Sequence, residues 1–188
     1  MRSVAVYCSS SDQLPQVTLD MARDLGRLLG SRGIRLVYGG GARGLMGIVA
    51  GAALAAGGAV QGFMLQALRE REGAGVAVGD LQFVATLEER KRLMAAAADA
   101  VIALPGGIGT LDEITEALTL ADIHRAPAPV CLCDADGFWD PFMLMISRFD
   151  AYGVIRAGLR NDLIHARGAA AAIDSCMAAL QAQTAAAA

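Results

Sequence analysis

The sequence predicts an α/β fold in which one doubly wound, mostly parallel sheet carries helices on both faces. Three observations support this fold class. Short apolar runs alternate along the chain with segments of helical periodicity. Glycine-rich or polar turns separate these elements. The chain has 188 residues, 55% of them hydrophobic, which suits one domain with a substantial core. Apolar strands that alternate with helices are typical of a parallel sheet buried on both faces.

The first elements follow from apolar runs and their boundaries. Val4–Cys8 is an apolar run that ends in three serines, which predicts a strand. Gln16–Ser31 has apolar residues at helical spacing and ends shortly before a glycine, which predicts a helix. Arg35–Tyr38 is a second predicted strand and stops at a triple glycine. Gly44–Ala56 is rich in alanine and predicts a helix, and Ala59–Phe63 predicts the third strand.

The middle of the chain repeats the unit. Arg69–Gly79 is rich in glycine and charge and is interpreted as a loop, with a mobile lid as its candidate role. Gln82–Ala85 predicts a short strand and Leu87–Ala98 the helix after it. Ala100–Leu104 is an apolar strand, and Thr110–Ile123 is the helix that follows a proline and glycine turn.

The last third of the chain completes the predicted sheet. Val130–Cys133 predicts a strand and Phe138–Tyr152 a helix. Leu163–His165 is a candidate last strand, and Ala169–Leu180 the last helix. We therefore expect one nucleotide-binding α/β domain over residues 1–183, with 184–188 as a flexible tail. Crossovers between the parallel strands are expected to be right-handed.

Charge, cysteine content and hydropathy exclude several classes of protein. The net charge of −3 gives no electrostatic basis for binding nucleic acid. The four cysteines do not form a zinc pattern, and we expect buried, reduced thiols, with Cys131 and Cys133 on opposite faces of one strand. No signal peptide is visible, and Ile48–Val60, the longest stretch of low polarity, is too short and glycine-rich to span a bilayer. A cytoplasmic protein without a membrane partner is the expectation.

The most informative segment is Pro105–Glu113, which directly follows an apolar strand. Its glycines let backbone N–H groups approach an anion, and the helix that starts behind them carries partial positive charge at its N-terminus. Glu113 lies about one turn into this helix. A phosphate cradle beside a carboxylate indicates chemistry on a phosphorylated small molecule.

Two other polar or glycine-rich loops also follow strands, at Ser9–Ser11 and Gly39–Gly47. In doubly wound sheets, ligands bind outside the carboxyl ends of the strands, near the switch in strand order. We therefore expect these loops to converge with Pro105–Thr110 on one nucleotide-sized site.

Simpler interpretations stay open for several of these residues. Gly39–Gly47 also fits a tight turn, and it matches neither a dinucleotide fingerprint nor a Walker loop. Thr110-x-x-Glu113 equally fits a helix capping box. The charged run Glu88–Arg92 fits a solvated helix face, although its first turn lies at the ligand edge, where an arginine can grip phosphate. We expect isolated surface or capping roles for His124 and His165.

Together, the triple-glycine segment Tyr38–Gly47, the Glu89-Arg90-Lys91 segment ending in Met94, and Pro105–Glu113 resemble the LOG (Lonely Guy) family, and the order and spacing fit along nearly the whole chain. Members of that family hydrolyse cytokinin riboside 5′-monophosphates and were long labelled lysine decarboxylases. The resemblance implies a Rossmann-like fold, a phosphoribohydrolase that uses no metal or other cofactor, and a homodimer or larger homo-oligomer with its site near the subunit interface.

Residue by residue, the resemblance implies catalytic roles for Arg90 and Glu113. A carboxylate beside C1′ stabilises the positive charge that develops on ribose when the N-glycosidic bond breaks. The residues expected to bind the nucleoside monophosphate and its phosphate are Ser9, Gly40, Gly41, Gly44, Met46, Lys91, Gly106, Gly107, Gly109, Thr110 and Glu116. A solvated position is the alternative for Glu116.

Three other functions are alternatives to the phosphoribohydrolase. A carrier of the molybdenum cofactor, or a nucleotide sensor, would keep the glycine loops but needs no Arg90–Glu113 pair. A pyridoxal-dependent decarboxylase needs a Schiff-base lysine, and Lys91, the only lysine, lies in a charged helical segment. The chain departs from the family pattern at Ser9, at Glu88, along Gly62–Leu65 and along Leu120–His124. These positions are expected near the base, so the preferred base, a cytokinin or adenine, stays open.

Overall fold

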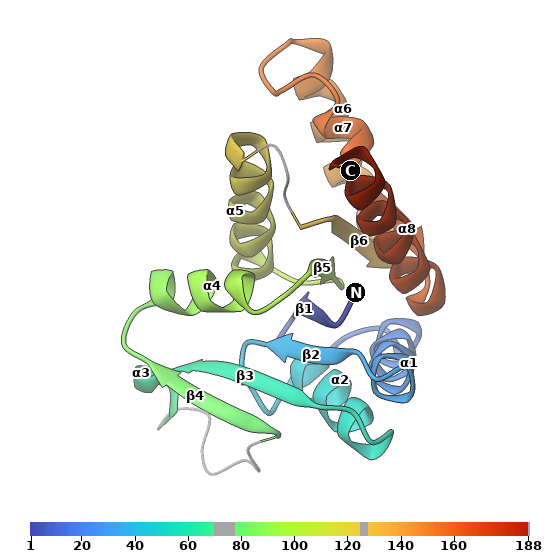
Figure 1. Cartoon of the computed structure of the whole chain (residues 1–188). Coiled ribbons are helices and arrows are strands. Elements are labelled where there is room, and N and C mark those ends of the chain that lie inside the picture. Colours follow the sequence, from blue (N-terminus) through green and yellow to red (C-terminus); the bar gives the residue numbers. More distant parts are fainter. Residues whose placement is uncertain (70–77, 125–127, 188) are drawn as a thin grey trace.

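The computed structural model of the protein describes residues 1–69, 78–124 and 128–187, and its sheet is parallel throughout (Figure 1). The strand order is β4-β3-β2-β1-β5-β6-β7. The strands are β1 (Ser3–Tyr7), β2 (Arg35–Tyr38), β3 (Val60–Leu65), β4 (Asp80–Val84), β5 (Ala100–Ala103), β6 (Val130–Asp134) and β7 (Ile164–Arg167). The helices are α1 (Gln16–Ser31), α2 (Gly44–Ala55), α3 (Gln66–Arg69), α4 (Leu87–Ala96), α5 (Ile108–His124), α6 (Asp140–Ala151), α7 (Leu159–Asp162) and α8 (Ala169–Ala187).

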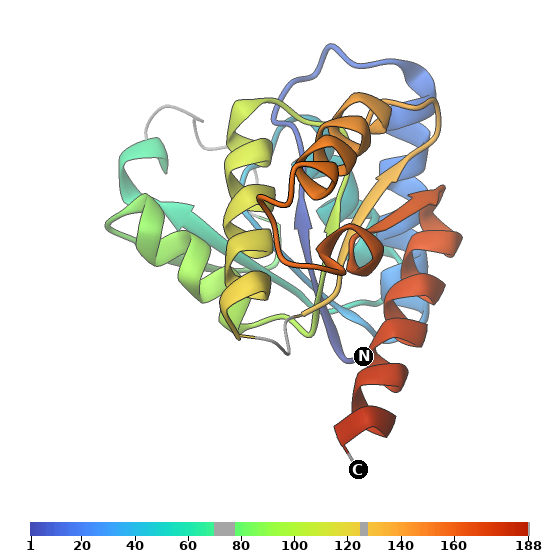
Figure 2. The ribbon, with the colours of Figure 1, turned by 90° about the horizontal axis from the view of Figure 1, so that it is seen from above.

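Helices cover both faces of this sheet (Figures 1 and 2). One core cluster joins the strands to α1, α2 and α8, and includes Leu25, Val49 and Ile173. A second cluster on the other face joins them to α4, α5 and α6, and includes Ile114 and Phe142. The prediction of a doubly wound, Rossmann-like α/β fold is therefore confirmed.

The high alanine and glycine content allows α1 and α2 to pack closely. A Cβ atom at Gly26 would lie 2.2 Å from the carbonyl oxygen of Val49, and one at Gly30 would lie 2.4 Å from that of Ala53. Small residues on both helices thus bring the two backbones together, which fixes α2 and the loop before it against the sheet.

The structure differs from the predicted elements at several points. The short helices α3 and α7 were not predicted, because a single turn leaves little periodicity to detect. Helix α8 continues to Ala187, through most of the segment predicted as a tail, since its alanines favour the helix. Most of the predicted loop and lid, residues 70–77, lies outside the described residues. None of the helices within the described ranges has the length and apolarity needed to cross a bilayer.

All four cysteines are buried free thiols, as predicted. The placement of Cys131 and Cys133 on opposite faces was wrong. Residues two apart in a strand point to the same side, and both lie in the cluster that also contains Cys176.

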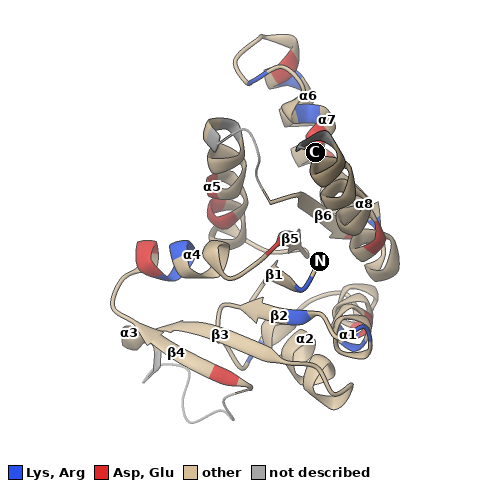
Figure 3. Cartoon of the chain, viewed as in Figure 1, with Lys and Arg blue, Asp and Glu red and all other residues tan. Residues whose placement is uncertain are grey.

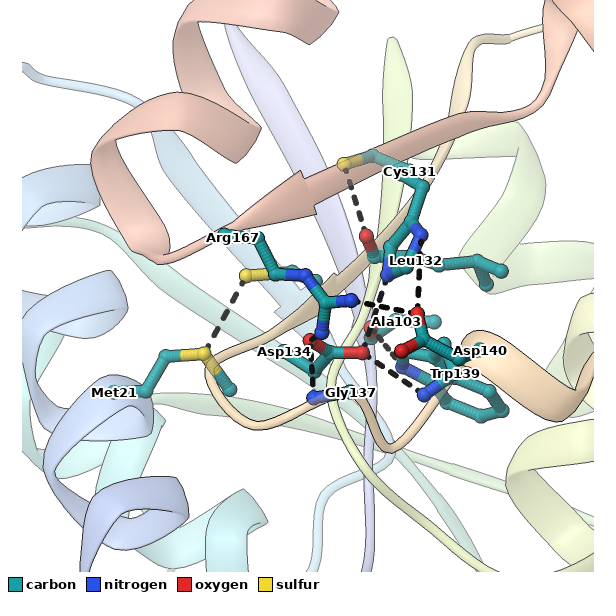
Figure 4. A network of polar contacts seen from close by, with 11 residues as sticks. Met21, Ala103, Cys131, Leu132, Asp134, Gly137, Trp139, Asp140 and Arg167 are labelled. Carbon is teal, nitrogen blue, oxygen red and sulfur yellow. Dashed lines mark hydrogen bonds and ion pairs between the residues drawn. The ribbon is translucent and has the colours of Figure 1, made fainter. Parts of the chain in front are cut away.

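A polar network ties the end of β6 to β7 and to the start of α6 (Figure 4). The fully buried carboxylate of Asp134 accepts hydrogen bonds from the backbone N–H of Trp139, at 2.9 Å, and from that of Gly137, at 3.2 Å. It also contacts His165 Nε2 at 3.2 Å and pairs with Arg167. The expectation that His165 is isolated is therefore wrong, and this cluster anchors the β6–α6 loop.

Candidate active site

The candidate site lies where the strand order reverses, because β1 is flanked by β2 on one side and β5 on the other. The loops that leave these strands are joined by backbone hydrogen bonds. The N–H of Ser9 donates to the carbonyl of Pro105 at 3.2 Å, and the carbonyl of Ser9 accepts from the N–H of Leu45 at 3.0 Å. The predicted convergence of the three loops is thus confirmed.

A pocket of about 360 Å³ opens at this point of the sheet edge. Its lining combines serine hydroxyls and glycine backbone with one arginine, one carboxylate and a few apolar side chains. The lining residues are Cys8, Ser9, Ser10, Ser11, Gly39, Met46, Leu68, Arg90, Gly107, Gly109, Thr110 and Glu113.

Helix α4 starts at the rim of this pocket because its N-terminus is capped. The Thr86 hydroxyl accepts from the N–H of Glu89 at 3.2 Å, and the Glu89 carboxylate accepts from the N–H of Ala85 at 3.0 Å. This reciprocal pattern closely resembles a capping box: it gives the N–H of Glu89 in the first turn an acceptor and ties the helix to the residue before its cap. The cap places the next residue, Arg90, in the first turn of α4. Figure 3 shows that acidic residues at the start of α4 are followed by basic ones.

The Arg90 side chain reaches from α4 into the pocket, where two acceptors fix it. Its Nε donates to the carbonyl oxygen of Phe63 on β3 at 3.0 Å. Its Nη1 lies 3.1 Å from Oε1 of Glu113 on α5. Side-chain exposure is only 14% for Arg90 and 9% for Glu113, so this ion pair is largely withdrawn from water.

Glu113 has an unusual protonation equilibrium for a glutamate. Burial raises the pKa of its carboxyl to about 7; Arg90 and Lys91 oppose this rise, and the neighbouring carboxylates Asp112 and Glu116 add to it. The capping role that the sequence left open for Glu113 is not what the structure shows. Helix α5 begins at Ile108, two residues before Thr110, and the Glu113 carboxylate faces Arg90 instead.

The N-terminus of α5 lines one end of the pocket. Cβ atoms added at Gly107 and Gly109 would meet nothing within 4 Å, so the backbone is open on the pocket side. At Gly106, by contrast, the Thr110 side chain occupies the space that a Cβ would need, with its Oγ1 2.1 Å from that position. The first N–H groups of a helix lack intrahelical acceptors and favour anions. This end of the pocket therefore suits an anionic group.

The glycine loop between β2 and α2 contributes few residues to the pocket lining. Gly40 has φ of 80° and Gly44 has φ of 58°, conformations that glycine adopts without strain. The N–H of Gly44 is bound by the Asp12 carboxylate at 2.8 Å, so the start of α2 is already capped by the chain itself. Of the binding residues predicted in this loop, Met46 lines the pocket, whereas Gly40, Gly41 and Gly44 do not.

Comparison with known proteins shows what the chain resembles. Residues 46–176 match a family model described as "Possible lysine decarboxylase". The protein named cytokinin riboside 5′-monophosphate phosphoribohydrolase LOG, from Oryza sativa subsp. japonica, is 43% identical over 165 residues, 88% of this chain and 68% of that protein. The chain belongs to the LOG family. A LOG protein of Arabidopsis thaliana, also named as a phosphoribohydrolase, is 40% identical over 88% of this chain and 77% of its own length.

Solved structures show the same fold as this LOG-family chain. The molybdenum cofactor carrier protein of Chlamydomonas reinhardtii superposes with a TM-score of 0.72 over 95% of this chain and 98% of its own, at 23% identity. The molybdenum cofactor binding protein of Rippkaea orientalis gives 0.70 over 94% and 95%, at 22% identity. At these identities the likeness extends to the fold alone.

Lys91 and Glu116 lie beside the pocket of this LOG-family chain and do not line it. Lys91 Nζ lies 2.9 Å from Asp112 Oδ2 and also pairs with Glu116. Hydrogen bonds to Glu116 and Asp112 raise the pKa of the Lys91 amine. Both residues were predicted to bind substrate, but the structure places them in a clamp between α4 and α5. An amine held this way is a poor Schiff-base nucleophile, which opposes the decarboxylase description.

Of the predicted site residues, the pocket of the LOG-family chain brings together Ser9, Met46, Arg90, Gly107, Gly109, Thr110 and Glu113. Gly39, Ser10 and Ser11 lie in the loops expected to converge here, although they were not named individually as binding residues, whereas Cys8 and Leu68 were missed. Gly39 begins the triple glycine and the serines end the first strand, so position after a strand was a usable signal for both. Leu68 belongs to the short helix α3, which the sequence did not reveal.

Proposed function

We propose that the protein hydrolyses the N-glycosidic bond of nucleoside 5′-monophosphates and releases free base and ribose 5-phosphate. The observation that carries this proposal is the buried Arg90–Glu113 pair, which shares one pocket with the open N-terminus of α5. The LOG relatives of rice and Arabidopsis are named for this reaction on cytokinin riboside 5′-monophosphates.

In this proposal the phosphate binds at the start of α5, among the N–H groups of Gly107, Gly109 and Thr110. The hydroxyls of Ser9 and its neighbours line the same pocket and add further donors. The phosphate is remote from the bond that breaks. The energy gained by binding it holds the ribose in position and offsets the cost of orienting the reacting atoms. A nucleoside without phosphate is therefore a poor substrate.

Glu113 supplies the charge that the reaction needs. As the bond from C1′ to the base breaks, positive charge develops on the ribose ring, and a buried carboxylate stabilises it. The same carboxylate takes a proton from the attacking water, whose oxygen bonds to C1′ as the bond to the base breaks. The base leaves with the electrons of that bond and takes up one proton from solvent, and Glu113 then releases its proton to solvent. A pKa of about 7 suits a group that accepts and releases a proton near neutrality.

Arg90 holds this carboxylate in place. Its guanidinium is fixed by Phe63 and touches Glu113, so the carboxylate has one preferred orientation toward the pocket. Arg90 lines the pocket, where its guanidinium N–H groups would suit a ribose hydroxyl.

Met46 and Leu68 form the apolar part of the pocket lining. Apolar side chains suit a base that carries an apolar N6 substituent, such as the isopentenyl group of a cytokinin. We therefore expect N6-isopentenyladenosine 5′-monophosphate to be preferred over AMP.

The test is to incubate the purified protein with N6-isopentenyladenosine 5′-monophosphate, with AMP and with adenosine, and to separate the products by chromatography. The proposal expects free base and ribose 5-phosphate from the nucleotides and little base from adenosine. Equal release from adenosine and AMP would contradict the role of the phosphate. Nucleotide binding without any base release would favour a carrier or sensor.

We further propose that two copies assemble through the face formed by Leu120 and Ile123 of α5 and Leu144, Met145 and Phe149 of α6. All five of these apolar side chains are exposed, and Leu144 is 73% exposed. Met145 and Phe149 also line a groove between α5 and α6. Light scattering after gel filtration tests this: we expect a dimer for the wild type, a monomer for Leu144→Glu, and a dimer for the control Val17→Glu on α1. A wild-type monomer would contradict it.

A further inference from the structure

We propose that Gly39 is a positioning residue: its missing side chain is the space that lets the Arg90 guanidinium lie against the backbone after β2 and reach Glu113. This inference rests on the proposed function, because it concerns the same Arg90–Glu113 pair. It assigns to the first residue of the triple glycine a role that differs from phosphate binding.

The steric argument comes from the position of the guanidinium. A Cβ atom at Gly39 would lie 1.8 Å from Arg90 Nη2 and 3.0 Å from its Cζ. The same atom would lie 3.2 Å from the sulfur of Met46. Gly39 directly follows β2, next to β3, whose Phe63 accepts from Arg90 Nε. The guanidinium therefore lies between the ends of two strands on one side and Glu113 on the other, without room for a methyl group.

Backbone conformation separates Gly39 from its neighbours. Gly40 and Gly44 have positive φ, so a side chain there would strain the backbone itself. Gly39 is not among the glycines of positive φ in the described residues, so its backbone accepts an alanine. An alanine at this position would therefore act through its volume. Its methyl group would force the end of the Arg90 side chain to move.

Displacement of Arg90 would change the titration of Glu113. The charged groups that face this carboxyl are Arg90 and Lys91 from α4, and Asp112 and Glu116 from its own helix. Tyr7 and Cys8, at the end of β1, also interact with it, but burial raises the pKa of both so that they stay neutral. Arg90 and Lys91 both lower the pKa of Glu113, and Arg90 has the larger effect. Moving Arg90 away therefore lets burial raise that pKa further.

The experiment compares Gly39→Ala, Arg90→Ala and the double variant, with Gly51→Ala as the matched control. A Cβ at Gly51, on the exposed side of α2, would meet nothing within 4 Å. We expect Gly39→Ala to lower kcat by about 100-fold, the cost of a misplacement of about 1 Å in a catalytic group. We expect Gly51→Ala to leave kcat and KM unchanged.

The double variant shows whether Gly39 acts through Arg90. Truncation of Arg90 empties the space that the methyl group needs, so Gly39→Ala should cost nothing further in the Arg90→Ala background. An equal additional loss in that background would overturn the inference, because Gly39 would then contact substrate or shape the loop directly.

A second readout does not depend on activity. The pKa of Glu113 can be followed by carbon-13 NMR of its carboxyl. It should rise above the wild-type value of about 7 in Gly39→Ala and keep the wild-type value in Gly51→Ala. An unchanged pKa in Gly39→Ala would overturn the inference even if the protein hydrolysed nucleotides. Conversely, failure of the wild type to release base would refute the proposed function and leave this titration as the test of the contact.

If Gly39→Ala lowers the stability of the fold, Tm values from thermal unfolding of the single and double variants still test the inference. A loss of Tm that is recovered in the double variant would come from the same contact and support the inference. A loss of Tm that persists in the double variant would overturn it.

Discussion

Arg90 and Glu113 lie on different helices, and the guanidinium Nη1 of one is 3.1 Å from the carboxylate Oε1 of the other. The cap on α4 places Arg90, and the second turn of α5 places Glu113. Burial keeps the pair largely out of water, so their interaction is stronger than that of a surface ion pair. This pair joins the fold to the proposed reaction.

The pH dependence of the reaction should follow the Glu113 carboxyl. Because burial raises its pKa to about 7, the carboxylate required for catalysis is lost below that pH. We expect kcat/KM to rise with pH up to about 7 and then level off, which a pH–rate profile with AMP measures. A profile that levels off near pH 4.5, the ordinary value for a glutamate, would show that Glu113 is not the titrating group.

Removal of the guanidinium should affect catalysis more than it affects substrate binding. In Arg90→Ala the carboxylate loses its partner and its orientation, and we expect kcat to fall by about 100-fold or more. Steady-state kinetics measure this. The neighbouring Arg92 is exposed on the same helix, so Arg92→Ala is the matched control and should keep wild-type kcat. Equal losses in the two variants would point to a general effect of charge on α4.

Because the backbone at the start of α5 is open, we expect Gly107→Ala to weaken substrate binding without lowering stability. A methyl group at Gly107 meets no protein atom within 4 Å, so Gly107→Ala should keep its Tm. It reduces the room for the phosphate, and we expect a KM for AMP that is about tenfold higher, as for the loss of about 1.4 kcal/mol of binding. An unchanged KM in steady-state kinetics would place the phosphate elsewhere.

The Asp134 network should contribute to stability and not to catalysis. Asp134→Ala leaves the N–H groups of Gly137 and Trp139 without their acceptor and removes one of the two carboxylates that pair with Arg167. We expect a loss of about 3 kcal/mol in the free energy of unfolding, measured with urea. The exposed Asp136 in the same loop gives the control Asp136→Ala, with little change expected.

The same network makes stability sensitive to acid. Burial alone would raise the pKa of Asp134, but hydrogen bonds from Trp139, His165, Gly137 and Arg167 hold it below its ordinary value. Its contribution is therefore fully present above the pKa of the unfolded chain, about 3.9. It is lost as the pH falls through the lower pKa of the folded state. Asp134→Ala should lack this acid-dependent loss, and a loss as steep as that of the wild type would contradict the assignment.

The sequence predicted the elements that repeat. Buried strands such as Ala100–Ala103 are continuous apolar runs, and the loops after them carry the polar residues of the site, so parallel order implied that these loops converge. Single-turn helices such as Gln66–Arg69 were missed, because one turn has no repeat to detect.

The roles of individual charged residues were harder to predict. Thr-x-x-Glu occurs at both Thr86–Glu89 and Thr110–Glu113, and the structure uses the first as a cap while Glu113 faces Arg90. The difference depends on where each helix starts and on what packs against it. Likewise, Lys91 pairs with carboxylates of α5 because of the packing of two helices, which no spacing within α4 reveals.

The most direct test of the account is base release from AMP by wild type, Glu113→Gln and the control Asp24→Asn, an exposed residue of α1. The account expects adenine and ribose 5-phosphate in equal amounts from the wild type and from Asp24→Asn. From a folded Glu113→Gln that still binds AMP, it expects a rate at least about 100-fold lower. Wild-type rates of base release from Glu113→Gln would contradict the central claim.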